Sequence, residues 1–313
     1  MIQAWKVPHI IKGALTYVPP LNRWRLRRGA TGGSGSARYC YAVWLRHLVM
    51  LNRHGFTVKG AVVGELGPGD SIGTGLAALL SGARRYVGLD VVPFSAKADL
   101  EQILTDIACL YSSREPIPDH DEFPAVRPRL TSYDFPSHLI QSEMLPAKID
   151  RIASALRSGL RQGTDISYIA PWTSVKDVES GSLDLIFSQA VLQYVDDLEM
   201  TYHAMFAWLK PGGFCSHSTG LGANDFSPFW NGHWAYTDFE WRVVRGRREF
   251  VLNRKSLNAH IIQARNAGFE LLFLEKEHAT TGLPVSALAD GFQDLDPDDL
   301  QTRGAMLILR KPQ

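Results

Sequence analysis

The chain has 313 residues, enough for one large domain or two small ones, and 45% hydrophobic with 21% charged residues is ordinary for a globular protein. Its formal net charge of +1 gives no general attraction to nucleic acid, and no apolar run approaches the roughly 18 residues of a membrane-spanning helix. Cys40, Cys109 and Cys215 are too widely spaced for a disulfide framework or a cysteine metal site. We therefore expect a cytoplasmic protein without a bound metal.

Residues 1–60 are expected to form an N-terminal helical or lid segment. Glycine and serine dominate residues 30–36, which favours either a flexible linker or a loop that folds over a site. The next stretch, 37–52, predicts an amphipathic helix, capped by Ser34 or Ser36 and ending before Gly55. Its apolar residues fall on one face: Tyr41, Trp44, Leu45, Leu48 and Leu51.

The most informative stretch is 61–90. It predicts a strand, a glycine-rich turn, a helix with apolar residues at helical spacing, and a second strand that ends in Asp90. Gly67, Gly69 and Gly73 allow the backbone to approach a ligand closely. An acid at the end of the second strand is well placed to hold ribose hydroxyls. The stretch therefore predicts a nucleoside-binding βαβ unit.

The rest of the chain continues to alternate strands with helices. An insertion at about 91–163 contains helices near 97–111 and 149–160 and is followed by strands at 165–172 and 183–187, a helix at 198–209 and a strand at 214–218. A second, aromatic insertion covers about 220–255, and its residues 241–254 favour a β-hairpin that turns near Gly246. A helix at 256–267 and strands at 269–274 and 305–309 complete the chain. The alternation predicts an α/β fold, and the missing helix before the last strand predicts that this strand runs antiparallel.

Three blocks resemble the class I S-adenosylmethionine-dependent methyltransferases. They are GELGPGDSIG at 64–73, VGLD ending at Asp90, and DLIFSQAVLQYVDD followed by WLKPGGF. The resemblance implies a Rossmann-like, doubly wound sheet of seven strands, mostly parallel with an antiparallel last strand, with helices on both faces. It places the methyltransferase domain at 61–313, with the two insertions, and implies S-adenosyl-L-methionine as the cofactor.

The resemblance also assigns cofactor-binding roles. Glu65 would orient the glycine turn and the methionine amino group, Gly67 and Gly69 would let the backbone pass close to the cofactor, and Asp90 would accept both ribose hydroxyls. Ser188 and Gln189 would line the methionine side near the reactive methyl.

The adenine site departs from the family pattern. The family commonly has an acid or amide after its third strand, whereas this chain has Tyr168-Ile169-Ala170-Pro171-Trp172. Backbone contacts from Ile169 or Ala170, or stacking on Trp172, are expected to replace it.

Three residues are candidates for work on the acceptor. His217 ends the predicted fifth strand, at the edge where ligands bind in open α/β sheets. His233 is the preferred base, because Trp230 and Trp234 beside it suit a carbohydrate or planar acceptor. Tyr194 is placed to face the acceptor. Structural roles in the core remain open for all of these side chains.

The acceptor itself is expected to be a small molecule or a glycan. ARYCYAVWLRHL, ELGPGDSIGTGLAALLSGA and WNGHW resemble bacterial methyltransferase-domain proteins associated with surface glycan modification. The arginines of 242–248 could hold a phosphate of the acceptor or form a solvated face. Two other hypotheses remain: an NAD(P)-dependent Rossmann oxidoreductase and a cofactor-binding module without catalysis. The sequence indicates no oligomeric state.

Overall fold

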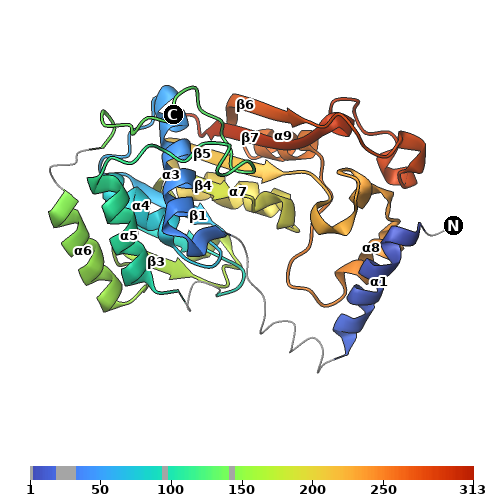
Figure 1. Ribbon diagram of the computed structural model, residues 1–313, viewed down its shortest axis with the longest axis horizontal. Coiled ribbons are helices and arrows are strands. Elements are labelled where there is room, and N and C mark those ends of the chain that lie inside the picture. The colour runs from blue at the N-terminus through green and yellow to red at the C-terminus, as the bar shows by residue number, and fades with distance from the viewer. Residues whose placement is uncertain (1–2, 19–32, 94–97, 141–144) are drawn as a thin grey trace.

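The computed structural model describes residues 3–18, 33–93, 98–140 and 145–313 (Figure 1). Residues 30–32 of the predicted glycine-serine loop, and the basic stretch before it, lie outside these ranges. Within them, no helix is both long enough and apolar enough to cross a membrane.

The fold is built on a sheet of seven strands in the order β3-β2-β1-β4-β5-β7-β6. The first five strands pair in parallel, and β7 runs antiparallel to both β5 and β6. This arrangement confirms the predicted doubly wound sheet and its antiparallel last strand. The strands are β1 (Val62–Leu66), β2 (Arg85–Leu89), β3 (Ile166–Ile169), β4 (Leu183–Gln189), β5 (Leu209–Gly220), β6 (Glu270–His278) and β7 (Thr302–Arg310).

Helices cover both faces of the sheet. One core contains Val63, Leu185 and Phe187, on which α3 (Ala37–Arg53), α4 (Gly73–Ser81), α5 (Leu100–Ser112) and α6 (Leu145–Ser158) pack. The other contains Val62 and Ile186, with α7 (Leu198–Trp208) and α9 (Leu257–Asn266). Neighbouring residues such as Val62 and Val63 enter different cores because successive side chains of a strand point to opposite faces.

The predicted helix at 37–52 is confirmed as α3, and Ser36 caps it by accepting a hydrogen bond from the Tyr39 N–H at 3.4 Å. The helices predicted near 97–111 and 149–160 correspond to α5 and α6, although Lys97 lies outside the described residues.

The predicted hairpin at 241–254 is wrong. Residues 241–245 belong to α8 (Asp238–Arg245), and residues 246–254 contain no strand. Thr237 and Glu240 form a reciprocal capping box that starts this helix, and Trp241 and Val244, three residues apart, are its buried side chains. Gly246, at φ +53°, ends the helix. The capping signal outweighed the local strand propensity of Val243 and Val244.

A smaller unit, called the cap here, packs beside the sheet and combines α1 (Val7–Ala14), α8 and the aromatic segment around 226–241 (Figure 1). The buried Lys6 ammonium donates to the Ala235 carbonyl at 2.6 Å and pairs with Glu240 at 3.0 Å. A Cβ on Gly13 would lie 2.0 Å from the Val243 carbonyl oxygen, so glycine is required where α1 crosses α8. The first helix of the chain is therefore fixed to residues more than 220 positions away.

Candidate functional site

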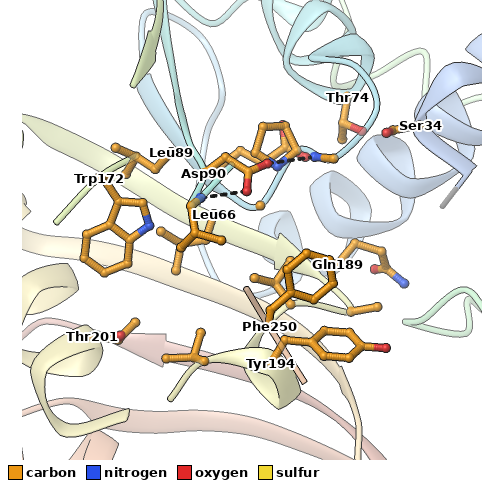
Figure 2. Close-up of a pocket in the computed structure, with 18 of the residues that line it drawn as sticks. Ser34, Leu66, Thr74, Leu89, Asp90, Trp172, Gln189, Tyr194, Thr201 and Phe250 are labelled. Carbon is orange, nitrogen blue, oxygen red and sulfur yellow. Dashed lines mark hydrogen bonds between the residues drawn. The ribbon is translucent and has the colours of Figure 1, made fainter. Parts of the chain in front are cut away.

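A cavity of about 400 Å³ opens at the carboxyl ends of β1, β2 and β4 (Figure 2). This is the edge of an open α/β sheet at which ligands bind. In Figure 2, Trp172 lies at the left of the cavity, Asp90 near its centre and Gln189 at the right. The volume suits a ligand of nucleoside size.

The glycine turn after β1 forms one wall. Gly67 and Gly69 both have positive φ, at +64° and +73°, which side chains disfavour. A Cβ on Gly67 would also lie 2.6 Å from a Val191 methyl group, and Val191 lines the cavity. The turn can therefore approach a ligand only because these positions lack side chains.

Asp90 is oriented by backbone N–H groups on both sides. Its Oδ2 accepts from Gly69 at 3.3 Å and its Oδ1 from Val91 at 2.7 Å, the interactions drawn as dashed lines in Figure 2. The side chain is 6% exposed, and burial raises its pKa, against the lowering effect of these N–H groups. The carboxylate is thus fixed in the lining with its orientation set before a ligand binds.

Glu65 is the second acid of the cavity and is buried more deeply. Its Oε2 accepts a hydrogen bond from the Tyr86 hydroxyl at 2.5 Å. Burial raises the pKa of Glu65 to about 8; the Tyr86 bond opposes this shift and the negative charge of Asp90 adds to it. A cation placed beside this carboxyl group would favour its ionised form.

The charges that line the cavity share one sign. Among the described residues of the lining, none is basic and five are acidic: Glu65, Asp90, Asp196, Asp197 and Glu249. Within the described part of the chain, Asp196 alone among these acids has an arginine partner, Arg245 of α8, which binds it with both terminal nitrogens. The lining therefore suits a cationic ligand better than an anionic one.

The wall towards the cap is aromatic. Tyr194 and Phe250 contact each other edge to face, with their ring centroids 5.7 Å apart, and both line the cavity. The Tyr194 hydroxyl accepts a hydrogen bond from the Asn224 amide at 2.9 Å, and burial raises its pKa. Tyr194 is therefore a neutral phenol near neutral pH, able to hold a polar group of a ligand.

The N-terminal segment contributes residues that the sequence did not identify as ligand-binding. Gly33 and Ser34 line the cavity, and Ser34 contacts the region after the glycine turn through Ser71. The Ser71 N–H donates to the Ser34 hydroxyl oxygen at 3.2 Å, and the Ser71 hydroxyl donates to the Ser34 carbonyl. The glycine-serine composition was the available signal, since it also favoured a loop that folds over a site.

The structure brings five of the seven residues predicted to bind the cofactor to the cavity wall: Glu65, Gly67, Gly69, Asp90 and Gln189. Ser188 and Ala170 are not part of this lining. The Ser188 hydroxyl is fully buried and bonded to His217 Nδ1 at 2.8 Å. Trp172, two residues beyond Ala170, lines the cavity instead, and its backbone N–H donates to the Asp90 carbonyl at 2.9 Å.

The three candidates for the acceptor separate in space. Tyr194 lines the cavity, whereas His217 is fully buried on β5 and His233 is 2% exposed beside Trp234 in the cap. Burial lowers the pKa of each histidine to about 3, so both imidazoles are neutral at neutral pH. In this conformation neither ring is part of the cavity wall, and their catalytic roles stay predictions.

The arginines of 242–248 do not form a cluster facing the cavity. Arg245 binds Asp196, the Arg247 guanidinium lies over the Tyr17 ring at 5.4 Å, and Arg248 donates to the Val244 carbonyl. In the part of the chain that the structure describes, no group of three or more histidine, cysteine or acidic side chains could hold a metal ion.

Comparisons with known proteins agree with this location. Residues 148–216 match the model of a family described as a methyltransferase domain. The matched segment includes β3, β4, α7 and part of β5, and thus the strand that carries Gln189. None of the curated proteins matches the sequence.

Solved structures with a similar arrangement include an S-adenosylmethionine-dependent methyltransferase from Mesorhizobium loti, at 14% identity and a TM-score of 0.40 over 85% of this chain and 97% of that one. Another is phosphoethanolamine N-methyltransferase 2 from Haemonchus contortus with S-adenosyl-L-methionine, at 16% identity and a TM-score of 0.42 over 86% and 53%. A third, from Listeria monocytogenes, has 14% identity and a TM-score of 0.41 over 86% and 98%. Similarity at this level assigns no substrate and no residue role. The sheet order is the predicted Rossmann-like one, and residues 148–216 match a methyltransferase-domain family.

Proposed function

We propose that this protein is an S-adenosylmethionine-dependent methyltransferase that transfers the methyl group to an oxygen, or to a nitrogen, of a small-molecule or glycan acceptor. The observation that carries the proposal is the cavity at the glycine turn, where Glu65 and Asp90 lie on either side of Gly67 and Gly69 in a lining whose charges are acidic. S-adenosylmethionine is a nucleoside with a sulfonium and an ammonium group, and this lining fits its charge as well as its size.

In the proposed complex, Asp90 holds the ribose hydroxyls, because its carboxylate is already oriented by Gly69 and Val91. Trp172 and Leu89 receive the adenine. Glu65 faces the methionine ammonium, and Gln189 lies on the methionine side of the cofactor, near the transferred methyl. The separation of Trp172 from Gln189 in Figure 2 supports this direction of binding.

When bound, the cofactor supplies a methyl group whose leaving group is a neutral thioether, so the chain must chiefly align the acceptor and exclude water. Tyr194 and Phe250 are proposed to form the acceptor wall, with the Tyr194 hydroxyl holding an acceptor oxygen. A planar or sugar-like acceptor suits these aromatic faces. His233 and His217 remain proposed bases for an opened form of the site.

The first test is calorimetry with S-adenosylhomocysteine. Wild type is expected to bind it, and Asp90→Ala is expected to weaken binding at least tenfold, since the variant removes a fixed acceptor of two ribose hydroxyls. Glu101→Gln, which changes an exposed acid of α5 outside the lining, is the control and should change affinity by less than threefold.

Absence of S-adenosylhomocysteine binding by the wild type would contradict the proposal. Binding of NADH in its place would favour an oxidoreductase. Binding without transfer of a labelled methyl group to any component of a cell extract would favour a non-catalytic module. A cytoplasmic location belongs to the proposal and is supported by Cys40, Cys109 and Cys215, all of which are free.

A further inference from the structure

We propose that His47, on α3, is a positioning residue for the methyl-donor site: it fixes the amide of Gln189 in a single orientation at the cavity wall. The inference rests on the proposed function for the identity of the ligand, although the interaction itself is a property of the free protein. His47 lies outside the segment that matches the methyltransferase family and outside the predicted methyltransferase domain.

The geometry connects α3 to two neighbouring strands. His47 is fully buried, and its Nε2 lies 3.2 Å from the Gln189 Oε1 while its Nδ1 lies 2.7 Å from the Ser216 hydroxyl. The imidazole also packs against the Phe187 ring, at 5.5 Å between ring centroids. Phe187 and Ser216 are paired across β4 and β5, so both face α3.

These contacts determine which nitrogen carries the proton. An amide oxygen can only accept a hydrogen bond, so Nε2 must donate to Gln189. Nδ1 is then the acceptor, and the Ser216 hydroxyl donates to it. Burial lowers the pKa of His47 to about 4, which keeps the ring neutral and this single tautomer in place near neutral pH.

The consequence for the site follows from the chemistry of the amide. With its oxygen bound by His47, Gln189 can offer a ligand its NH₂ group, a hydrogen-bond donor. The backbone also fixes the position of Gln189. The next residue, Ala190, has φ +56° and donates its N–H to the Ser218 carbonyl at 2.8 Å. A donor at this place suits the methionine carboxylate of the cofactor.

A pair of substitutions separates this role from general packing. A glutamine side chain carries its amide nitrogen about as far from the backbone as histidine Nε2, whereas an asparagine reaches only as far as Nδ1. His47→Gln therefore keeps a donor for Gln189, and His47→Asn loses it. His260→Asn is the matched control, because His260 is equally buried, has the Tyr202 hydroxyl 3.3 Å from its Nδ1, and lies outside the cavity lining.

Two ligands localise the effect. S-adenosylhomocysteine carries the amino-acid end, and 5′-methylthioadenosine lacks it. We expect His47→Asn to weaken the binding of S-adenosylhomocysteine about tenfold, because the hydrogen bond from Gln189 to the charged carboxylate is lost. The affinity for 5′-methylthioadenosine should change less than twofold. His47→Gln and His260→Asn should stay within threefold of wild type for both ligands. Adding His47→Asn to Gln189→Ala should weaken the binding of S-adenosylhomocysteine no further than Gln189→Ala alone.

Wild-type affinity of His47→Asn for S-adenosylhomocysteine would overturn the inference, as would equal weakening of both ligands, which indicates a loosened fold. If wild type binds neither ligand, the proposed function fails, and the inference is decided by nitrogen NMR of the free protein. An Nε2-protonated His47 that changes in Gln189→Ala supports it, and an Nδ1-protonated ring overturns it.

Discussion

Glu65 combines two roles that oppose each other in the free protein. In the proposed complex the carboxyl group is ionised to attract the methionine ammonium, yet in the free protein burial raises its pKa to about 8. In the unfolded chain its pKa is near the ordinary value of about 4.5. The folded state therefore favours the protonated form, and the stability that this gives is present below pH 4.5 and is lost as the pH rises through 8.

The prediction for Glu65→Gln follows from this sign. The side chain of the variant cannot ionise. In urea unfolding of the ligand-free protein, its free energy of unfolding relative to wild type should therefore rise between pH 5 and 8, by up to about 1.4 kcal/mol per pH unit. Glu249→Gln, which also replaces a carboxyl group by an amide but at an exposed position, is the control. A constant difference for Glu65→Gln would mean that Glu65 is not held in its protonated form.

The residues that the sequence could identify are those with local signals. Gly67, Gly69 and Asp90 belong to one βαβ unit, in which spacing alone brings glycines and acid to the same sheet edge. The partners of His47 and Ser34 could not be found this way, because they lie 142 and 37 residues away and only the tertiary packing brings them together. Long-range pairing also explains why His217 and His233 were expected near the acceptor but lie in cores.

At the scale of elements, the strands and most helices follow from apolar periodicity, because each strand or helix buries one face. The cap is different. Its aromatic residues stand out in the sequence, but the helical start at Thr237 does not, since the capping box TDFE is followed directly by a strand-like run. The same unit depends on the crossing of α1 and α8, which no periodicity indicates.

Gly13→Ala tests that crossing. Alanine normally stabilises a helix relative to glycine, but here its Cβ would lie 2.0 Å from the Val243 carbonyl oxygen and 2.6 Å from that of Val244. We expect the unfolding free energy to fall by about 1–3 kcal/mol, with faster tryptic cleavage near Lys12. Gly35→Ala is the control, because its Cβ would meet nothing within 4 Å. Equal behaviour of the two variants would contradict the close crossing.

At the scale of the whole molecule, buried imidazoles govern the response to acid. His47, His217, His233 and His260 have folded pKa values lowered by burial to about 4, 3, 3 and 4. In the unfolded chain they titrate near 6.5, so below that pH the unfolded state binds more protons. These groups therefore destabilise the fold as the pH falls from about 6.5 towards 3–4 and have no effect above 6.5.

The measurable result is a fall of the urea midpoint between pH 6.5 and 4.5. Glu65 and Asp90, whose pKa values burial raises, work in the opposite direction, and the four histidines outnumber them. His260→Asn removes one of the titrating groups without changing the cavity lining. The urea midpoint of this variant should therefore fall less steeply with falling pH than that of wild type. Identical slopes would show that His260 does not remain neutral in the folded protein.

The contact between α1 and α8 also sets an order of events during synthesis. Lys6 leaves the ribosome long before its partner Ala235, and the 229 residues between them take roughly 10 to 50 seconds to translate. Throughout that interval the first helix has no docking surface, while the strands of the glycine turn can already pair. The parallel strands β1–β5 precede Ala235 in the chain and can therefore pair first, whereas β6 and β7 follow α8 and complete the sheet only after α1 and α8 can dock.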